Sequence, residues 1–444
     1  LAHAALLLIL TMIVITGAPA EKEAKIIVKP APPIKPYDPE VEQALKETPE
    51  IKLPENEEVA PVELVDPVID EIPQGEPDNA SNKDMKSDQA ADAMGVGATG
   101  AAGRFGDPRS KRREAWIGRD PGGSRKKTTV IRAALQWLKR HQSSNGGWDA
   151  DGWQGQCQSG ACQGKQPERC TEQGGAVCDV GVTGLATLAF TGDGHTHRSG
   201  EFKDVVHKAR RWLLRQQHSD GSLGFHEGHH AGAYNHAIAT MALCELYGVT
   251  RDFTLKRPAQ KAVDFTLKSQ NPNLGWRYGI KDSHNDTSVT GWQVLALKAA
   301  RTAGLDVPDA AFAGAQRWFQ RATNTEGRTG YLSPGSGSSM LAANDGKFDA
   351  VPCMTAVAVV CRIFTGERLS SEAVRSGAKI VADSPPAWSG RKLNFYYWYY
   401  GTYAMYQVAR HWKGWEKDML AAVMPHQRDK GCVDGSWDPV GEWC

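Results

Sequence analysis

Two hydrophobic patterns alternate along residues 127–444. Segments such as residues 128–142 carry apolar residues on one side and Lys or Arg on the other, which is typical of a half-exposed helix. Segments such as residues 180–192 are apolar on nearly every face and rich in small residues, which is typical of a helix that is buried all round. The alternation predicts an all-α protein with an outer and an inner layer of helices.

The patterns predict six outer and five inner helices. We expect the outer helices near residues 128–142, 201–218, 257–270, 308–323, 370–383 and 414–427. We expect the inner helices near residues 180–192, 233–248, 286–303, 351–365 and 394–412. No inner segment follows the last outer one, so we expect an incomplete ring that has lost a sixth inner helix by truncation.

A recurring turn follows most of the outer segments. Residues 134–148 read ALQWLKRHQSSNGGW, in which Gln142 follows Trp137 by five residues and the turn closes on Gly-Gly-Trp. Four similar stretches occupy residues 209–225, 262–276, 315–331 and 422–437. The inner segments in turn align on Thr183, His236, Thr290, Thr355 and Tyr400. Self-similarity at a period of tens of residues predicts a repeat architecture.

These Gln…Gly…Trp stretches resemble the QW-type repeats of the squalene-hopene cyclase, oxidosqualene cyclase and protein prenyltransferase β-subunit superfamily. The resemblance covers about residues 127–444 and implies an α/α toroid of concentric helices. In its combination of a repeat domain with a membrane anchor, the chain is similar to prenyltransferase/squalene-oxidase-repeat proteins predicted in planctomycete-type bacteria. The activity of those proteins is not established. The alternative is a generic helical solenoid, in which this turn is not expected.

The N-terminal residues 1–20 contain an uninterrupted apolar run, which is short for a membrane span. The stretch Ala18-Pro19-Ala20 resembles a cleavage site, which favours a signal peptide. However, the chain begins at Leu1 and lacks a basic segment before the apolar run, so we favour a membrane anchor that begins inside a longer hydrophobic helix. Both interpretations predict an exported protein with the helical domain on the extracytoplasmic side.

Residues 21–126 show neither hydrophobic period. They contain many Pro and Glu residues, then a Gly/Ala-rich stretch at 95–106 and a basic one at 109–113. Such a composition cannot bury enough apolar surface to fold, so it predicts a disordered linker. The basic stretch could contact anionic lipid headgroups, but a solvated linker is the preferred interpretation.

The net charge and the cysteines bear on the kind of partner and on the cellular compartment of the protein. The formal net charge of the 444 residues is +1, which argues against nucleic acid as a partner. One long loop contains Cys157, Cys162, Cys170 and Cys178. Their spacing differs from that of a zinc knuckle, and export favours disulfides of unknown connectivity. Cys432 and Cys444 are a further candidate pair, whereas Cys244 and Cys361 lie in apolar segments and are expected to be packing thiols.

The third inner segment opens at the place where squalene-hopene cyclases resemble one another in a DxDDTA motif. Asp286 and Thr287 match the last acid and the Thr, whereas Ser283 and Asn285 replace the other two acids. Asn cannot supply the proton that the middle acid supplies in that family. The residues themselves favour an N-cap role for Asp286, because Asp179 occupies the aligned position in the first inner segment.

Other candidate chemistry is incomplete. The run His226-Glu227-Gly228-His229-His230 contains a glycine, which predicts a loop rather than a helix face that holds two metal ligands, so a polar loop is preferred to a metal site. Asp349 and Cys353 are placed like two ligands of the prenyltransferase zinc site, but the next unit offers no His. The chain also lacks the DDxxD motif that binds magnesium. We therefore expect neither a metal nor a cofactor.

Two functions remain open. One is a terpenoid-cyclase-like or prenyltransferase-like envelope protein that binds, or also transforms, an isoprenoid or other apolar ligand in a central cavity. Its candidate acid and base are Asp286 and His236, and Trp292 and Tyr400 are candidates to line the cavity by cation–π contact. The other is a non-catalytic binding or scaffold module. In either case the mouth of the ring is expected to gather Asp179, Tyr234, His236, Asp286, Thr287, Cys353 and Trp398.

Overall fold

The computed structural model describes residues 123–156, 174–226, 229–337, 351–389 and 393–438. These residues form eleven α-helices and no strand, in agreement with the predicted all-α class. None of the described helices has the length and apolar character needed to cross a membrane. The predicted anchor and nearly all of the predicted linker lie outside the described residues.

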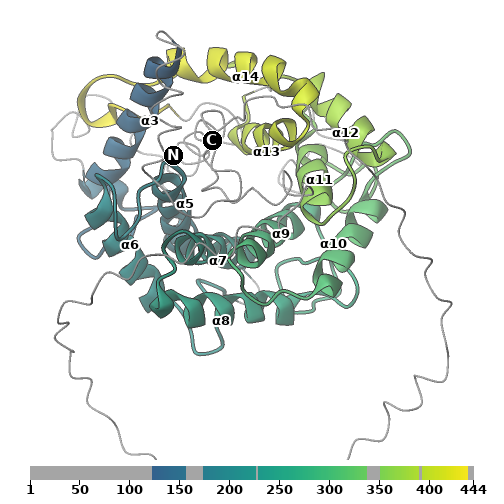
Figure 1. Cartoon of the computed structure of the whole chain (residues 1–444), viewed down its shortest axis with the longest axis horizontal. Coiled ribbons are helices and arrows are strands. Elements are labelled where there is room, and N and C mark those ends of the chain that lie inside the picture. The colour runs from purple at the N-terminus through teal and green to yellow at the C-terminus, as the bar shows by residue number, and fades with distance from the viewer. Residues whose placement is uncertain (1–122, 157–173, 227–228, 338–350, 390–392, 439–444) are drawn as a thin grey trace, which may run out of the picture. The chain divides into compact units, whose positions relative to one another are not determined.

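The helices form two layers of the predicted sizes. The helices with one exposed face are α3 (Gly123–Arg140), α6 (Lys203–Arg215), α8 (Phe253–Ser269), α10 (Asp309–Ala322), α12 (Glu372–Ala382) and α14 (Ala409–Val423). The helices buried on nearly every face are α5 (Asp179–Gly192), α7 (His230–Thr250), α9 (Thr287–Thr302), α11 (Cys353–Phe364) and α13 (Phe395–Gln407). Figure 1 shows the second set as an inner arc with the first set outside it.

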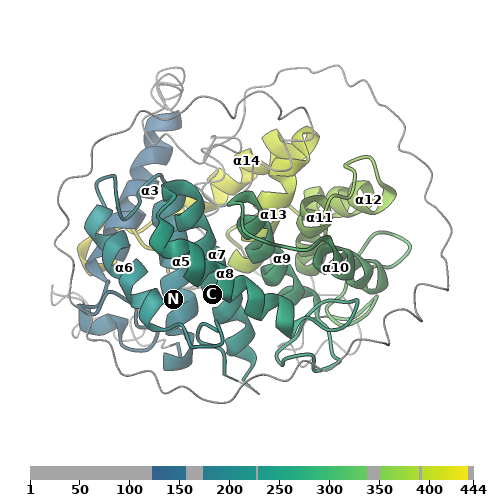
Figure 2. The same ribbon diagram turned by 60° about the horizontal axis from the view of Figure 1, so that its bottom comes forward.

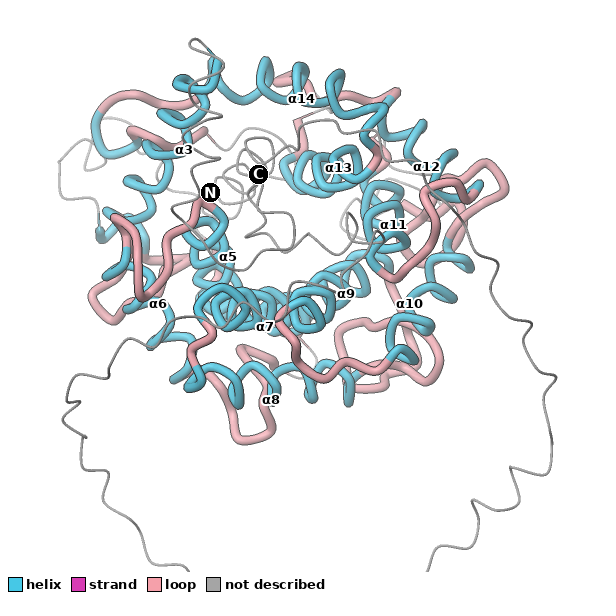
Figure 3. The backbone as a smooth tube through the Cα atoms, viewed as in Figure 1, coloured by secondary structure: helices cyan, strands magenta, loops and turns pink. Residues whose placement is uncertain are grey.

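Each inner helix packs against the next one along the chain and against outer helices. Figures 1 and 2 both show α7 beside α9, with α8 on their outer side. Small residues allow this close packing. A Cβ atom added at Gly184 of α5 would lie 2.9 Å from Ile238 Cγ2 of α7, and one at Gly291 of α9 would lie 2.4 Å from Val357 Cγ1 of α11. Loops that contain a few short 3-10 turns connect the inner helices to the outer helices (Figure 3).

Several helix boundaries differ from the prediction, and two of the differences have a clear local cause. Helix α8 begins four residues earlier than expected, because Asp252 caps it by accepting the Thr254 N–H at 3.0 Å. Helix α13 ends at Gln407 rather than near residue 412. Val408 has non-helical backbone angles, and the chain then turns into α14, whose buried face includes Trp412.

A glutamine after an outer helix links successive repeats. The Gln142 side-chain amide donates to the Gly146 carbonyl of its own turn at 2.9 Å and to the Val205 carbonyl of α6 at 3.0 Å. The same pair of bonds runs from Gln217 to Gly221 and Pro258, from Gln270 to Leu274 and Ala311, and from Gln427 to Gly435 and Val130. The predicted repeat is therefore a physical connection between neighbouring outer helices.

The last of these links joins the end of the described chain to its beginning. The Gln427 amide donates to the Val130 carbonyl of α3 at 2.8 Å. Beside it, Lys127 Nζ of α3 lies 2.7 Å from Glu416 Oε1 of α14. Gly435 has a φ of 91°, and a Cβ atom there would lie 2.1 Å from the Ala133 carbonyl oxygen of α3. Only glycine combines this backbone angle with such a close approach.

Two of the cysteines expected in disulfides lie within the described residues. Cys178 and Cys432 are free thiols in the structure, and Cys157, Cys162, Cys170 and Cys444 lie outside the described residues. Cys432 Sγ instead lies 3.5 Å from His141 Nε2, between the last turn and the first outer helix. Cys244 and Cys361 are buried thiols within α7 and α11, as the sequence predicts.

Replacing Gln427 with Ala should lower the free energy of unfolding by about 1–3 kcal/mol, because two hydrogen bonds to partly buried carbonyls are lost. Urea denaturation measures the loss, and amide exchange should accelerate in α3 more than in α9. The control is Gln136→Ala, whose side chain bonds to Glu201 in an exposed contact. An equal effect of the two substitutions would contradict the role of the link.

Candidate functional site

Hydrogen bonds join the N-terminal ends of three inner helices. The Tyr234 hydroxyl of α7 donates to Ser288 Oγ of α9 at 2.9 Å, and Ser288 Oγ lies 2.7 Å from the Tyr396 hydroxyl of α13. Each of these residues lies within the first two turns of its helix. The starts of α7, α9 and α13 therefore meet at one end of the inner layer.

Asp286 lies at this end, directly before α9, and is fully buried. Its Oδ1 accepts the Val289 N–H at 2.7 Å, which caps the helix as the sequence predicts. Its Oδ2 has no hydrogen-bond partner among the described residues. Arg277 Nε lies 3.8 Å from this oxygen, and this nitrogen also lacks a partner there. One oxygen of Asp286 thus stabilises the helix, and Arg277 and the Tyr331 hydroxyl lie against the carboxyl group.

Burial raises the pKa of Asp286 from its ordinary value of 3.8 to about 7. The Val289 N–H, the Arg277 charge and the Tyr331 hydroxyl oppose this rise, since they favour the carboxylate. A carboxyl group with a pKa near neutrality holds a proton for part of the time and can give it to a bound molecule. Such a group meets the requirement for a general acid.

The residues around Asp286 are fixed by the neighbouring loop. The Thr287 N–H donates to the Tyr331 carbonyl at 3.0 Å, and its hydroxyl donates to the Gly330 carbonyl at 2.7 Å. Asn285 Oδ1 accepts from Asn271 Nδ2 at 3.2 Å. Ser283, the other replacement of a motif acid, is exposed. Thr287 and Asn285 therefore hold the loop in place.

Two predicted cavity residues, Trp292 and Tyr400, lie in contact. The Trp292 ring of α9 stacks on Tyr399 of α13 at 5.5 Å and meets the Tyr400 ring edge-on at 5.6 Å. All three side chains are buried, and the Tyr399 and Tyr400 hydroxyls lack partners among the described residues. They form an aromatic wall between α9 and α13, which we call the Trp292 wall. Tyr396 connects it to the end where Asp286 lies.

His236 is placed away from this wall, against outer helix α8. Its Nδ1 accepts the Leu223 N–H of the preceding turn at 3.2 Å, and its Nε2 lies 3.0 Å from Thr266 Oγ1 of α8. Burial lowers the pKa of His236 to about 4. The aligned Thr183, Thr290 and Thr355 accept the backbone N–H of Trp148, Trp276 and Thr329 in the same way. His236 thus performs the structural task of threonine in the other repeats.

The remaining predicted site residues are Trp398 and Cys353, which lies near Tyr396 and Tyr397 and adds to the rise that burial causes in their pKa. Cys353 is the first residue of α11 and is buried. Trp398 packs against Phe395 at 5.2 Å and Trp388 at 6.0 Å. Trp388 in turn stacks on His426, which follows α14. Of the residues expected at the mouth, the structure therefore brings Tyr234, Asp286 and Thr287 together near the Trp292 wall.

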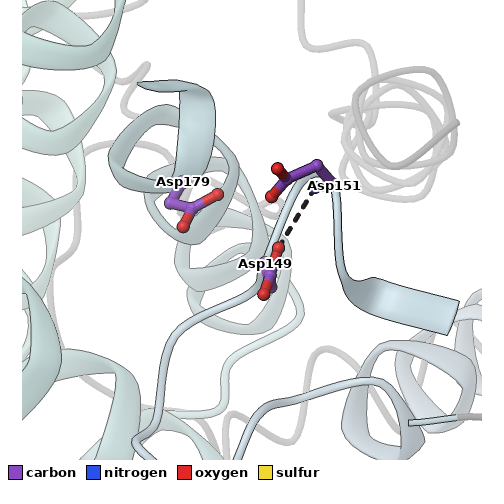
Figure 4. Close-up of side chains that lie close together, drawn as sticks. All are labelled: Asp149, Asp151 and Asp179. Carbon is purple, nitrogen blue, oxygen red and sulfur yellow. Dashed lines mark hydrogen bonds between the residues drawn. The ribbon is translucent and has the colours of Figure 1, made fainter. Parts of the chain in front are cut away.

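A carboxylate cluster that the sequence analysis missed includes Asp179. Asp149, Asp151 and Asp179 each offer an oxygen within 4.8 Å of the other two (Figure 4). Asp179 Oδ1 accepts the Ala150 N–H at 2.9 Å, and burial raises the pKa of Asp179 to about 6. Hard cations prefer oxygen ligands, but half-exposed acids alone assign no ligand. The available signal was the Asp-x-Asp-Gly run directly after Trp148.

Comparison with models of protein families and with curated proteins found no match to the chain.

Replacing Asp286 with Asn should flatten the pH dependence of stability. The folded-state pKa lies above the ordinary value, so the folded chain holds a proton that the unfolded chain releases between pH 3.8 and about 7. In the parent protein the free energy of unfolding therefore falls as pH rises through this window, by up to about 1.4 kcal/mol per unit. An Asn cap is compatible with the fold, because Asn394 caps α13 in the same way. Urea unfolding between pH 4 and 8 measures both slopes, and equal slopes would refute the assigned shift.

Replacing His236 with Thr should destabilise the protein less than replacing it with Ala, by about 1 kcal/mol. The Thr hydroxyl can accept the Leu223 N–H as it does in three other repeats, whereas Ala leaves this buried N–H without a partner. Thermal unfolding of the two variants measures the difference. Equal losses of thermal stability in His236→Thr and His236→Ala would disprove the structural role of His236.

Proposed function

We propose that residues 127–444 form an α/α toroid of the terpenoid-cyclase and protein-prenyltransferase type, which binds an isoprenoid or another apolar ligand within its inner layer. Two helical layers and the Gln427 link back to α3 support this architecture. The Trp292 wall offers buried aromatic faces suited to an apolar chain. In this proposal residues 1–20 tether the protein to a membrane through the linker 21–126, with the toroid outside the cytoplasm.

The observation that carries the proposal is the fully buried Asp286 carboxyl group at the start of α9. Proton donation to an alkene or oxygen of the ligand would leave a cation, which aromatic faces stabilise. In the resembling cyclases the middle acid of the motif donates the proton. Here that position is Asn285, whose amide oxygen is engaged by Asn271. In the proposal Asp286 is therefore the proton donor. His236 has no part in the proposed chemistry.

A non-catalytic binding or scaffold module on the same fold is the second candidate. The Val289 N–H donates to Asp286 Oδ1 and so caps α9. This capping bond favours the non-catalytic module, because it explains why an aspartate occupies the position without any catalysis. The sequence also lacks DDxxD and the complete zinc triad of the resembling enzymes. Ligand conversion, rather than ligand binding, separates the two candidates.

Purified full-length protein should bind isoprenoids, detectable by mass spectrometry of extracted lipid and by titration with isoprenoids of increasing length. Trp292→Ala should weaken binding about tenfold, because the stacking surface is lost. The matched control is Trp388→Ala, which removes a Trp that stacks on His426. Conversion that Asp286→Asn abolishes without weakening binding supports catalysis, and binding without conversion supports the module. No binding of any isoprenoid, with no lipid in the extract, would reject the first candidate and leave the scaffold module.

A further inference from the structure

Helix α3 differs in charge from the other outer helices. It contains six Lys or Arg residues and neither Asp nor Glu. The helices α6, α8, α10, α12 and α14 each contain at least one acidic residue. Because the net charge of the whole chain is only +1, the positive charge of α3 is a local feature. A surface with one sign of charge attracts ligands of the opposite sign.

A groove of about 620 Å³ runs along α3. Its other side is formed at Asp434, beside Gly435, which packs closely against the Ala133 carbonyl of α3. A cavity of this size suits a small molecule or a few residues of a peptide. The lining residues on α3 include Thr129, Arg132, Ala133, Gln136 and Arg140. The walls of the groove therefore carry two arginines and one aspartate.

Arg132, Gln136 and Arg140 form a row along the groove. Residues four apart lie on one face of an α-helix, and the two arginines are separated by about 12 Å along the helix axis. Arg132 Nη2 and Gln136 Nε2 both donate to Glu201 Oε1, at 2.9 Å and 3.1 Å. Glu201 lies in the turn before α6 and is exposed. This contact shows that the row can hold a carboxylate.

Arg140 is the arginine of the row that has no acidic partner among the described residues. Its Nη2 donates to the Asp434 backbone carbonyl at 2.6 Å, which orients the guanidinium group. A neutral carbonyl leaves the positive charge uncompensated. Arg132 also keeps donors for a further ligand, because a guanidinium group has five N–H donors and Glu201 engages one nitrogen. The row therefore offers two cationic groups at a fixed separation.

We propose that this groove binds an extended acidic peptide whose carboxylates are about four residues apart. An extended chain rises about 3.3 Å per residue, so four residues span about 13 Å and match the separation of the two arginines. Each guanidinium group can pair with a carboxylate through two parallel N–H···O bonds. The Gln136 amide between them can both donate to the peptide backbone and accept from it. The site lies on the outer layer, so it goes beyond the proposed function and does not depend on it.

Fluorescence anisotropy of labelled peptides with purified full-length protein tests the site. One peptide has two glutamates separated by three neutral residues, and the other has the same composition with the glutamates adjacent. The first should bind about fivefold more tightly, because only this peptide reaches both arginines. Arg132→Gln and Arg140→Gln should each weaken its binding about tenfold. The matched control is Lys139→Gln, which removes the neighbouring charge outside the groove and should change binding less than about twofold.

Glu201→Gln should change the affinity in the opposite direction. The substitution removes the carboxylate that competes for Arg132 and Gln136. Binding of the first peptide should therefore strengthen about threefold. Damage to the fold would weaken binding instead, so a gain in affinity identifies competition for the row. A loss of affinity in Glu201→Gln would contradict the site.

Three other outcomes would overturn the inference. Equal losses in Lys139→Gln and Arg140→Gln would show a diffuse attraction to the basic helix. Equal affinity for the two peptides would exclude a site with spaced charges. Binding of phosphatidylglycerol vesicles without binding of either peptide would identify a membrane contact instead. Arg132→Gln leaves the Arg140 contact with Asp434 in place, so this variant tests the site even if Arg140→Gln folds poorly.

Discussion

The two-donor amide of a glutamine side chain is the interaction on which the outer layer depends. One N–H closes the turn that ends the repeat, and the other reaches a carbonyl of the next outer helix, as Gln142 does with Gly146 and Val205. A shorter side chain cannot reach both acceptors. In the fourth copy Thr323 bonds instead to Phe319 of its own helix, and Arg362 of α11 contacts its hydroxyl. The connection there passes through an inner helix.

This outer layer fixes the position and depth of the inner helices. Four of the turns donate a backbone N–H to the aligned inner residue, which is Thr183, Thr290, Thr355 or His236. The starts of the inner helices are thereby held near one end of the layer. Asp286 becomes fully buried as a result, and burial rather than any neighbouring charge is the main cause of its raised pKa. The chemistry at this acid is a consequence of the packing.

The two aspartates that start inner helices show how one position acquires different surroundings. Asp179 remains half-exposed and lies against Asp149 and Asp151 of the preceding loop. Asp286 has no acidic neighbour within such a cluster and lies against Arg277 and tyrosines. The first arrangement brings negative charges together, and the second isolates one carboxyl group in an apolar interior. Proton donation requires the second arrangement, because isolation and burial favour the protonated acid.

The sequence by itself determined the helical class, the number of helices in each layer and the repeat register. These features follow from local periodicity, because the exposed and buried faces of a helix are encoded every few residues. It also identified Asp286 as a cap and paired Trp292 with Tyr400 as interior residues. Only the tertiary structure decided that His236 substitutes for threonine and that Asp286 is buried beside Arg277 and Tyr331. Periodicity states which groups are buried, but whether a buried group finds a partner depends on distances between segments that meet only after folding.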